Sequence, residues 1–97
     1  MKNFTILIPV YNDWESLEKL LNEINFFVKD IKNCSFSCLV INDASTLPIS
    51  NIKKPKNISS IRIINMKENQ GHARCNAAGL KYIFEKEEFD YVIPMDG

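Results

Sequence analysis

Glycine and cysteine are both scarce, with three of each among 97 residues. The first glycine is Gly71, so the G-x-G-x-x-G loop that binds dinucleotides after a first strand is missing. The glycine-rich phosphate loop of a sugar nucleotidyltransferase is missing for the same reason. Cys34, Cys38 and Cys75 are odd in number and form no C-x-x-C pair, which argues against a disulfide framework or a zinc site. We expect reduced, mostly buried thiols.

A dominant charge is also lacking, because 12 basic residues balance 12 acidic ones and the net charge is zero. Such a chain has no general attraction for phosphate backbones or anionic lipid, so we expect no nucleic-acid partner. The one basic segment, residues 53–56, is interpreted as a solvated loop. The apolar content of 45% and the charged content of 25% are typical of a globular domain.

Long hydrophobic runs are absent as well. No apolar stretch approaches the roughly 20 residues that cross a bilayer, and the first residues lack the apolar core and cleavage site of a signal peptide. We therefore expect a cytoplasmic protein. Membrane contact, at the cytoplasmic face, would come only through regions beyond residue 97.

Four short apolar segments, rich in β-branched and aromatic residues, predict four strands. They cover residues 4–10, 36–42, 61–66 and 89–95, and residues 44–59 carry two prolines and predict a mostly irregular connection. Because no hairpin turns separate the strands and the crossovers are long, we expect parallel pairing in an α/β fold. A chain of this length makes one small domain.

Two helices are predicted, after the first and the third strand. Asn12 with Glu15 forms a plausible capping box for the first helix. Its apolar face, spaced in steps of three and four, comprises Trp14, Leu17, Leu20, Leu21, Ile24, Phe27, Val28 and Ile31. The second helix follows residue 71, and its apolar stripe comprises Ala73, Ala77, Leu80 and Phe84. Gly79 on this helix permits close packing against the sheet.

A polar or acidic cluster follows each predicted strand. These clusters are residues 9–12, 42–46, 69–74 and 95–97. In an open parallel sheet, ligands bind just outside the carboxyl ends of the strands. The four clusters therefore predict one shared binding site.

Two of the clusters offer groups that suit a nucleobase. Tyr11 can stack its ring on a base, while Pro9 stiffens the approach and leaves its own carbonyl free. Asp43 can accept a hydrogen bond from a ring N–H and so select the base. Each cluster also has a structural interpretation: a turn and helix cap for residues 9–12, and side-chain-to-backbone hydrogen bonds for residues 42–46.

The other two clusters suit an anion and a metal ion. Gly71 opens a helix, so backbone N–H groups, the helix dipole and Arg74 can face an anion, although Arg74 is equally well a surface residue. His72 is interpreted as solvent-facing or a cap more readily than as a ligand contact. Asp96 offers the hard oxygen ligand that Mg²⁺ or Mn²⁺ prefers beside the oxygens of a diphosphate.

In their order and spacing, these clusters resemble the motifs of the family 2 glycosyltransferases over the whole chain. The matching segments are Pro9-Val10-Tyr11-Asn12, Asn42-Asp43-Ala44-Ser45-Thr46 for the family's Asp-Asp-Gly-Ser-Thr, Asn69-X-Gly71 with Ala73-Arg74-X-Asn76-X-X-Gly79, and Met95-Asp96-Gly97 for the start of its Asp-X-Asp. Asn42 departs from the first of the family's paired acids, and Ala44 replaces a common glycine. Neither change removes the carboxylate of Asp43.

The resemblance implies a GT-A fold, of which residues 1–97 would be the nucleotide-binding half, as a single partial domain. That half would be a Rossmann-like three-layer α/β/α arrangement with a mostly parallel sheet. The implied partners are a nucleotide-diphospho-sugar donor, a sugar or lipid-phosphate acceptor, and Mg²⁺ or Mn²⁺. The implied nucleotide-binding residues are Pro9, Tyr11, Asp43, Arg74 and Asp96, with Asp96 also on the metal.

The same resemblance implies that the remaining parts of the site lie beyond residue 97. These are the second metal carboxylate, the acceptor pocket and, in inverting enzymes, the general base. We therefore expect no catalytic residue within the chain and no transferase turnover from it alone. The alternative is a degenerate or truncated module that binds a nucleotide without catalysis.

Overall fold

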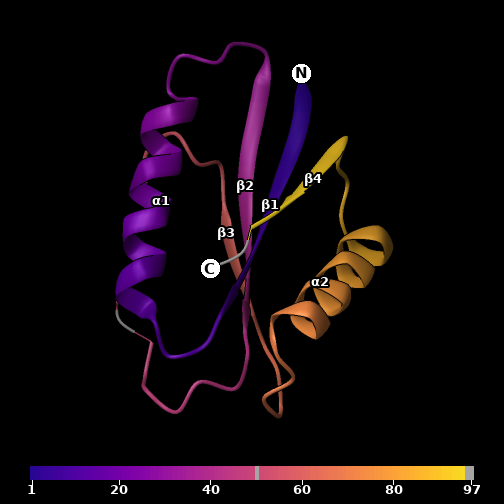
Figure 1. Cartoon of the computed structure of the whole chain (residues 1–97). Helices are drawn as coiled ribbons and strands as arrows, with labels where there is room; N and C mark the ends of the chain where they lie inside the picture. Colours follow the sequence, from indigo (N-terminus) through magenta and orange to yellow (C-terminus); the bar gives the residue numbers. More distant parts are fainter. Residues whose placement is uncertain (50, 96–97) are drawn as a thin grey trace.

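A computed structural model describes residues 1–49 and 51–95 as one sheet with a helix on each face (Figure 1). The elements are β1 (Lys2–Val10), α1 (Trp14–Val28), β2 (Cys34–Asn42), β3 (Ile61–Asn65), α2 (His72–Lys86) and β4 (Tyr91–Pro94). The strand order is β3-β2-β1-β4, and each neighbouring pair is parallel. The predicted Rossmann-like α/β/α arrangement is confirmed.

The core is divided between the two faces of the sheet, because successive strand residues point to opposite sides. The buried residues on the α1 side are Ile6, Ile8, Val10, Trp14, Leu17, Leu21, Ile24, Phe36, Cys38, Val40 and Ile58. The buried residues on the α2 side are Leu7, Leu39, Ile41, Cys75 and Ile83. The α1 side therefore holds the larger part of the apolar core.

The N-cap of α1 lies one residue after the predicted one. Asp13 is the N-cap, and its Oδ1 accepts the N–H of Ser16 at 3.2 Å. The predicted capping box of Asn12 with Glu15 is wrong, because Asn12 adopts a left-handed backbone with φ of 61° and turns its side chain to another loop. A residue that bonds elsewhere cannot cap the helix.

The predicted apolar face of α1 is confirmed as far as Val28, except at Phe27, and is wrong at Ile31. Trp14, Leu17, Leu21 and Ile24 are buried, and Leu20 and Val28 pack partly buried against them. Phe27 is 74% exposed and Ile31 is 48% exposed. Phe27 lies on the flank of the helix that faces solvent, and Ile31 follows the helix, where helical spacing no longer applies.

The predicted stripe of α2 is wrong except at Leu80, which packs partly buried against the core. The buried residues are Cys75, Gly79 and Ile83, whereas Phe84 of the predicted stripe is 68% exposed. The reason is the close approach of the helix backbone at Gly79, where an added Cβ would overlap Cδ1 of Leu7. The predicted close packing at Gly79 is confirmed, and it selects the face that contacts the sheet.

Strand boundaries differ from the predictions by up to two residues: β2 starts earlier, at Cys34, and β4 is shorter than predicted. In the described part of the long connection, residues 43–49 and 51–60, the backbone forms no helix or strand, as predicted. The three thiols are free, with Cys38 and Cys75 fully buried. Within the part of the chain that the structure describes, neither helix is long and apolar enough to cross a membrane.

Candidate functional site

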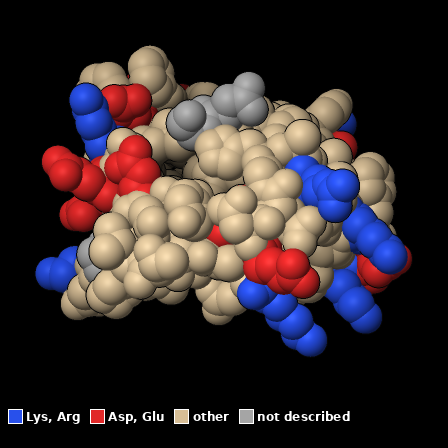
Figure 2. Space-filling model, turned by 60° about the horizontal axis from the view of Figure 1, so that its bottom comes forward, with Lys and Arg blue, Asp and Glu red and all other residues tan. Residues whose placement is uncertain are grey.

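The ends of β1, β2 and β3 and the loops that follow them gather at one end of the sheet (Figure 1). The β1–α1 turn, the loop after β2 and the loop that leads into α2 all lie there. Seen from this end (Figure 2), the middle of the surface consists mainly of uncharged side chains, and most charged side chains lie around its margin. The predicted convergence of the first three clusters is therefore observed.

A pocket of about 310 Å³ opens at this end, beside the last residues of β1. β4 pairs with β1 as far as Leu7 opposite Pro94, and among residues 1–49 and 51–95 no strand pairs with that edge of β1 beyond Leu7. The pocket is lined by Ile8, Pro9, Val10, Tyr11, Asp13, Ser16, Leu17, Leu20 and His72. It therefore unites β1, α1 and the first residue of α2.

Two predicted nucleotide contacts, Pro9 and Tyr11, line this pocket, and the Tyr11 side chain is 43% exposed. His72 joins them from the opposite face of the sheet. A wider hollow of about 770 Å³ lies along the outer surface of α1, but residues of that helix alone line it. We place the candidate site at the smaller pocket, because only there do strand ends and a helix N-terminus converge.

Asp43 follows β2 and is only 1% exposed. One carboxylate oxygen accepts the N–H of Gln70 at 2.7 Å, and the other accepts the N–H of Gly71 at 2.9 Å. Burial by itself would raise the pKa of this carboxyl, but hydrogen bonds from Gln70, the Cys75 thiol and Gly71, with the charge of His72, hold it below its usual value. The ionised carboxylate thus anchors the loop that leads into α2.

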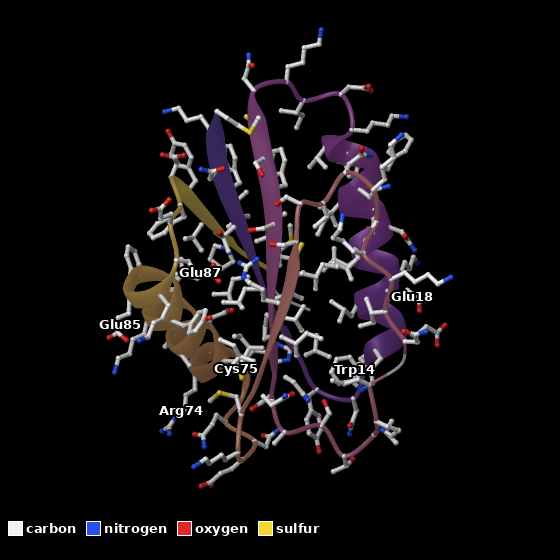
Figure 3. All side chains as sticks on the ribbon, turned by 180° about the vertical axis from the view of Figure 1, so that it is seen from behind. Trp14, Glu18, Arg74, Cys75, Glu85 and Glu87 are labelled. Carbon is white, nitrogen blue, oxygen red and sulfur yellow. The ribbon has the colours of Figure 1, made fainter. Side chains whose placement is uncertain are left out.

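Cys75 extends this anchor into the helix itself. Its side chain points from α2 toward the sheet (Figure 3) and is fully buried. Burial, with the hydrogen bond to Asp43, raises the pKa of the Cys75 thiol to about 12. The thiol therefore remains protonated and serves as a donor to the carboxylate.

The two residues at which the chain departs from the family motif have clear local roles. Asn42 accepts the N–H of Ser45 at 3.0 Å and donates to Oδ1 of Asn65 at 2.9 Å, so it uses both ends of an amide. An ionised aspartate at this position would have no N–H to donate to Asn65. Ala44 adopts a φ of 57°, a left-handed conformation that glycine enters freely and alanine enters at a cost of roughly 1–2 kcal/mol.

Asn12 connects the β1–α1 turn to the loop after β2. Its Oδ1 accepts the N–H groups of Thr46 at 2.8 Å and Leu47 at 2.9 Å, and its Nδ2 donates to Oγ1 of Thr46 at 3.1 Å. Its own N–H donates to Oγ of Ser45 at 2.9 Å. Two loops that flank the site are therefore held as one unit.

Arg74 is exposed and projects outward from the start of α2 (Figure 3). Its Nη1 donates to Oε1 of Gln70 at 3.2 Å. The N-cap of the helix is Gly71, which provides no side-chain cap, and no acidic residue lies in the first turn. Arg74 and the N-terminus of α2 thus present positive potential at this end of the sheet.

The predicted metal ligand, Asp96, lies outside the described residues. Among residues 1–49 and 51–95, no group of three or more His, Cys, Asp and Glu side chains is arranged to hold a metal ion. The carboxylate of Asp43 is already occupied by backbone donors. The described residues alone therefore do not fit a metal site.

Sequence reasoning missed two features of this site. It interpreted Asn12 as a helix cap, whereas Asn12 joins two loops; the available signal was that asparagine enters left-handed turns more readily than most residues. It favoured solvent or a cap for His72, and His72 is exposed, but it did not foresee that the exposed residue lines the pocket. No local signal identified that position, because it depends on where α2 starts relative to β1.

The model of the protein family described as glycosyl transferase family 2 matches residues 5–97. This match includes each of the three described clusters. No curated protein matches the chain, and no solved structure does so either.

Proposed function

The chain belongs to glycosyl transferase family 2, and from that premise we propose that it binds the nucleotide-diphospho-sugar donor of a sugar transfer to a hydroxyl acceptor. One observation supports this most strongly. Pro9 and Tyr11 from the end of β1 and His72 from the start of α2 line one pocket of about 310 Å³. This is the position at which parallel α/β sheets bind their ligands.

The nucleobase is assigned to the β1 side of the pocket. Tyr11 provides an exposed aromatic ring on which a base can stack, and Pro9, which is less than 2% exposed, stiffens the strand end that leads to it. Stacking is tolerant of base identity, because every base has a π face. Selection of the base therefore requires a hydrogen-bonding group in addition to Tyr11.

Asp43 is the group that we assign to base selection, under one structural condition. Its oxygens already accept the N–H groups of Gln70 and Gly71, and the residue is 1% exposed. A carboxylate oxygen has a second lone pair for a ring N–H. The base reaches that lone pair only if the loop of residues 69–71 moves aside on binding.

The diphosphate is assigned to the start of α2. Arg74 carries a charge that can pair with phosphate oxygens, and the N-terminus of the helix adds the positive end of its dipole. The Asp43 carboxylate takes the N–H groups of Gln70 and Gly71, so those of the first helical turn itself are the ones left for an anion. These groups would hold the phosphates beside the base.

The remaining roles follow from family membership. A divalent ion, Mg²⁺ or Mn²⁺, would neutralise the charge that develops on the diphosphate leaving group, with Asp96 as its assigned ligand. The proposed acceptor is a sugar hydroxyl or a polyprenyl phosphate, and the proposed location is the cytoplasm or the cytoplasmic face of a membrane. We assign no catalytic base within residues 1–97.

The test is a titration of the chain with UDP, GDP, CDP, ADP and dTDP in the presence of Mg²⁺, followed by NMR and calorimetry. We expect one nucleotide to bind tightest and to shift the amide signals of Tyr11, Gln70 and Gly71. Tyr11→Leu should weaken binding. Tyr91→Leu is the matched control, because Tyr91 is a similarly exposed tyrosine, 49% against 43%, on β4.

Three outcomes separate the proposal from its alternatives. Binding that depends on Tyr11 and not on Tyr91 supports it, and sugar incorporation from a matching donor would add turnover to the donor-binding role. Binding without any turnover in a longer chain favours a nucleotide-binding module that has lost catalysis. A folded chain that binds none of the five nucleotides would contradict the proposal.

A further inference from the structure

We propose that Asn12 is a positioning residue for the donor: it fixes the turn that carries Tyr11 against the loop of residues 45–47 and so keeps the pocket in its binding shape. The inference rests on the proposed function, because it concerns the same site. Asn12 itself does not line the pocket, whereas both of its neighbours, Tyr11 and Asp13, do. Its effect on a ligand would therefore be indirect.

The side chain of Asn12 is fully engaged with the loop after β2. Its carbonyl oxygen accepts two consecutive backbone N–H groups, those of Thr46 and Leu47, and its amide nitrogen donates to the Thr46 hydroxyl. Residues 44–49 form no helix or strand, so no backbone ladder fixes them. Their position depends on side-chain contacts of this kind.

Two further contacts tie the same pair of segments together. The backbone N–H of Asn12, which directly follows Tyr11 in the chain, donates to Oγ of Ser45 at 2.9 Å. Nε1 of Trp14 donates to the carbonyl of Leu47 at 3.2 Å, and Trp14 is the buried first residue of α1. The turn is thus held at Asn12, which follows Tyr11, and at Trp14, which follows Asp13.

The turn needs this support because its backbone is strained. The N–H of Asp13 donates to the carbonyl of Tyr11 at 2.8 Å, which closes a three-residue turn with Asn12 at its centre and φ of 61°. The form of this turn with positive φ is rare and strained. Such conformations persist where the surroundings over-determine them. Without its side-chain contacts, the turn would relax and carry the Tyr11 ring with it.

The experiment compares Asn12→Gly with Asn12→Asp. Glycine keeps the left-handed backbone accessible and removes every side-chain contact, whereas aspartate keeps the oxygen that accepts the Thr46 and Leu47 N–H groups. Affinity is measured for the nucleoside diphosphate that binds the unchanged chain tightest, well below the melting temperature of each variant. Far-UV circular dichroism confirms that each variant is folded.

We expect Asn12→Gly to raise the Kd by about 10-fold or more, because binding must then order a mobile turn. The Kd of Asn12→Asp should remain within about threefold of the Kd of the unchanged chain. Such a change is smaller than the 1.4 kcal/mol that a tenfold change in Kd needs. Asn33→Gly is the matched control: Asn33 also has a left-handed backbone, with φ of 62°, but lies before β2 and away from the pocket. Its Kd should not change.

A purely structural role would lower the melting temperature of Asn12→Gly while leaving its Kd equal to that of the unchanged chain, and this result would overturn the proposal. Equal loss of affinity in Asn12→Asp and Asn12→Gly would also overturn it, because the shared acceptor would then not matter. If the unchanged chain binds none of the nucleotides, the proposed function and this inference both fail. Binding by the unchanged chain with no effect at Asn12 defeats only the inference.

Discussion

The two helices are attached to opposite faces of the same sheet by different means. α1 buries a continuous apolar stripe, with Trp14, Leu17, Leu21 and Ile24 all at most 5% exposed. These residues face the inner residues of β1 and β2 across the larger part of the core. The free energy gained by burial is roughly proportional to the apolar area removed from water. The stabilisation that α1 gains from packing is therefore spread along its length.

α2 buries Cys75, Gly79 and Ile83 against the other face of the sheet, and three specific contacts fix it along its length. At its start, Asp43 binds the preceding loop and the Cys75 thiol. In its middle, Gly79 approaches Leu7 closely. At its end, Glu87 forms an ion pair with Arg62 of β3.

This difference has a functional meaning. A helix held by a broad apolar contact surface tolerates small shifts, because its stabilisation is divided among many weak contacts. A helix held by a buried charged hydrogen-bond anchor at its first turn keeps that turn in one place. The start of α2 carries His72 and Arg74, so the anchor holds both in place in the free chain, and base selection by Asp43 requires the loop of residues 69–71 to release it.

Leu21→Ala gives the largest expected effect and tests the attachment of α1. Leu21 is 1% exposed, so truncation removes buried area and leaves a cavity that costs about 2–5 kcal/mol. Urea denaturation measures the free energy of unfolding. Leu20→Ala is the control, because Leu20 is only partly buried on the same helix. Equal losses from the two variants would contradict a stripe centred on Leu21.

Asp43→Asn should come next, with a loss of about 2–3 kcal/mol at pH 7, because an amide replaces a buried charge that accepts several hydrogen bonds. Urea denaturation at pH 7 measures the loss. Asp90→Asn is the control: its exposed carboxylate accepts the N–H of Asn3 at 2.7 Å, where water can substitute. A loss no greater than that of the control would contradict the anchor.

The same pair of chains gives a pH test with a defined sign. The folded-state pKa of Asp43 lies below its ordinary value, so its stabilising contribution is present above the unfolded pKa of about 3.9 and is lost as pH falls through the folded pKa. The stability difference between the unchanged chain and Asp43→Asn should therefore be constant from pH 7 to about pH 5 and shrink below it. A difference that grows toward low pH would contradict the assignment.

Gly79→Ala should destabilise the chain by about 1–2 kcal/mol, although alanine is the better helix former by about 0.5–1 kcal/mol. The new Cβ would overlap Cδ1 of Leu7, so either the buried Leu7 side chain or the helix must shift. Ala77→Gly on the exposed side of α2 is the control and should cost about 1 kcal/mol through propensity alone. Helix propensity alone predicts that Gly79→Ala stabilises the chain and that Ala77→Gly destabilises it. Stabilisation by Gly79→Ala would show that α2 does not depend on this close contact.

Arg62→Met should give the smallest effect, about 1 kcal/mol or less, because the side chains of Arg62 and Glu87 are 30% and 13% exposed and water screens the pair. Arg62→Lys should recover only part of the loss, since the guanidinium bonds both oxygens of Glu87. Thermal melts at low and high salt measure the effect, and the loss should be smaller at high salt. A loss as large as that of Leu21→Ala would reverse the ranking of the two attachments.

The contrast between the helices also explains which predictions from sequence succeeded. The buried stripe of α1 repeats every three to four residues, so periodicity located it until the helix ended at Val28. The buried face of α2 consists of a thiol, a glycine and one isoleucine, Ile83, so little of it stands out from the sequence as an apolar pattern. Ala73, Ala77 and Phe84 were therefore assigned to the wrong face.

The candidate site divides in a similar way. Its segments could be located from sequence, because polar residues after parallel strands must meet at one edge of a sheet. Tyr11 and Pro9 were identified in this way, and both line the pocket. The engagement of Asp43 by Gln70 and Gly71 could not be foreseen, because a carboxylate accepts from any nearby donor and sequence does not say which is nearest.

The sequence by itself determined the order of strands and helices, the parallel sheet, the inward stripe of α1 and the segments that meet at the site, because these follow from local propensity and periodicity. Only the tertiary structure decided which face of α2 is buried, that Asp43 is an anchored and nearly inaccessible carboxylate, and that Asn12 joins two loops. The contacts of Asp43 and Asn12 link residues 27 to 35 positions apart, and that of Gly79 depends on the missing side chain of a single residue. Geometry of this kind is set by packing, and no local pattern encodes it.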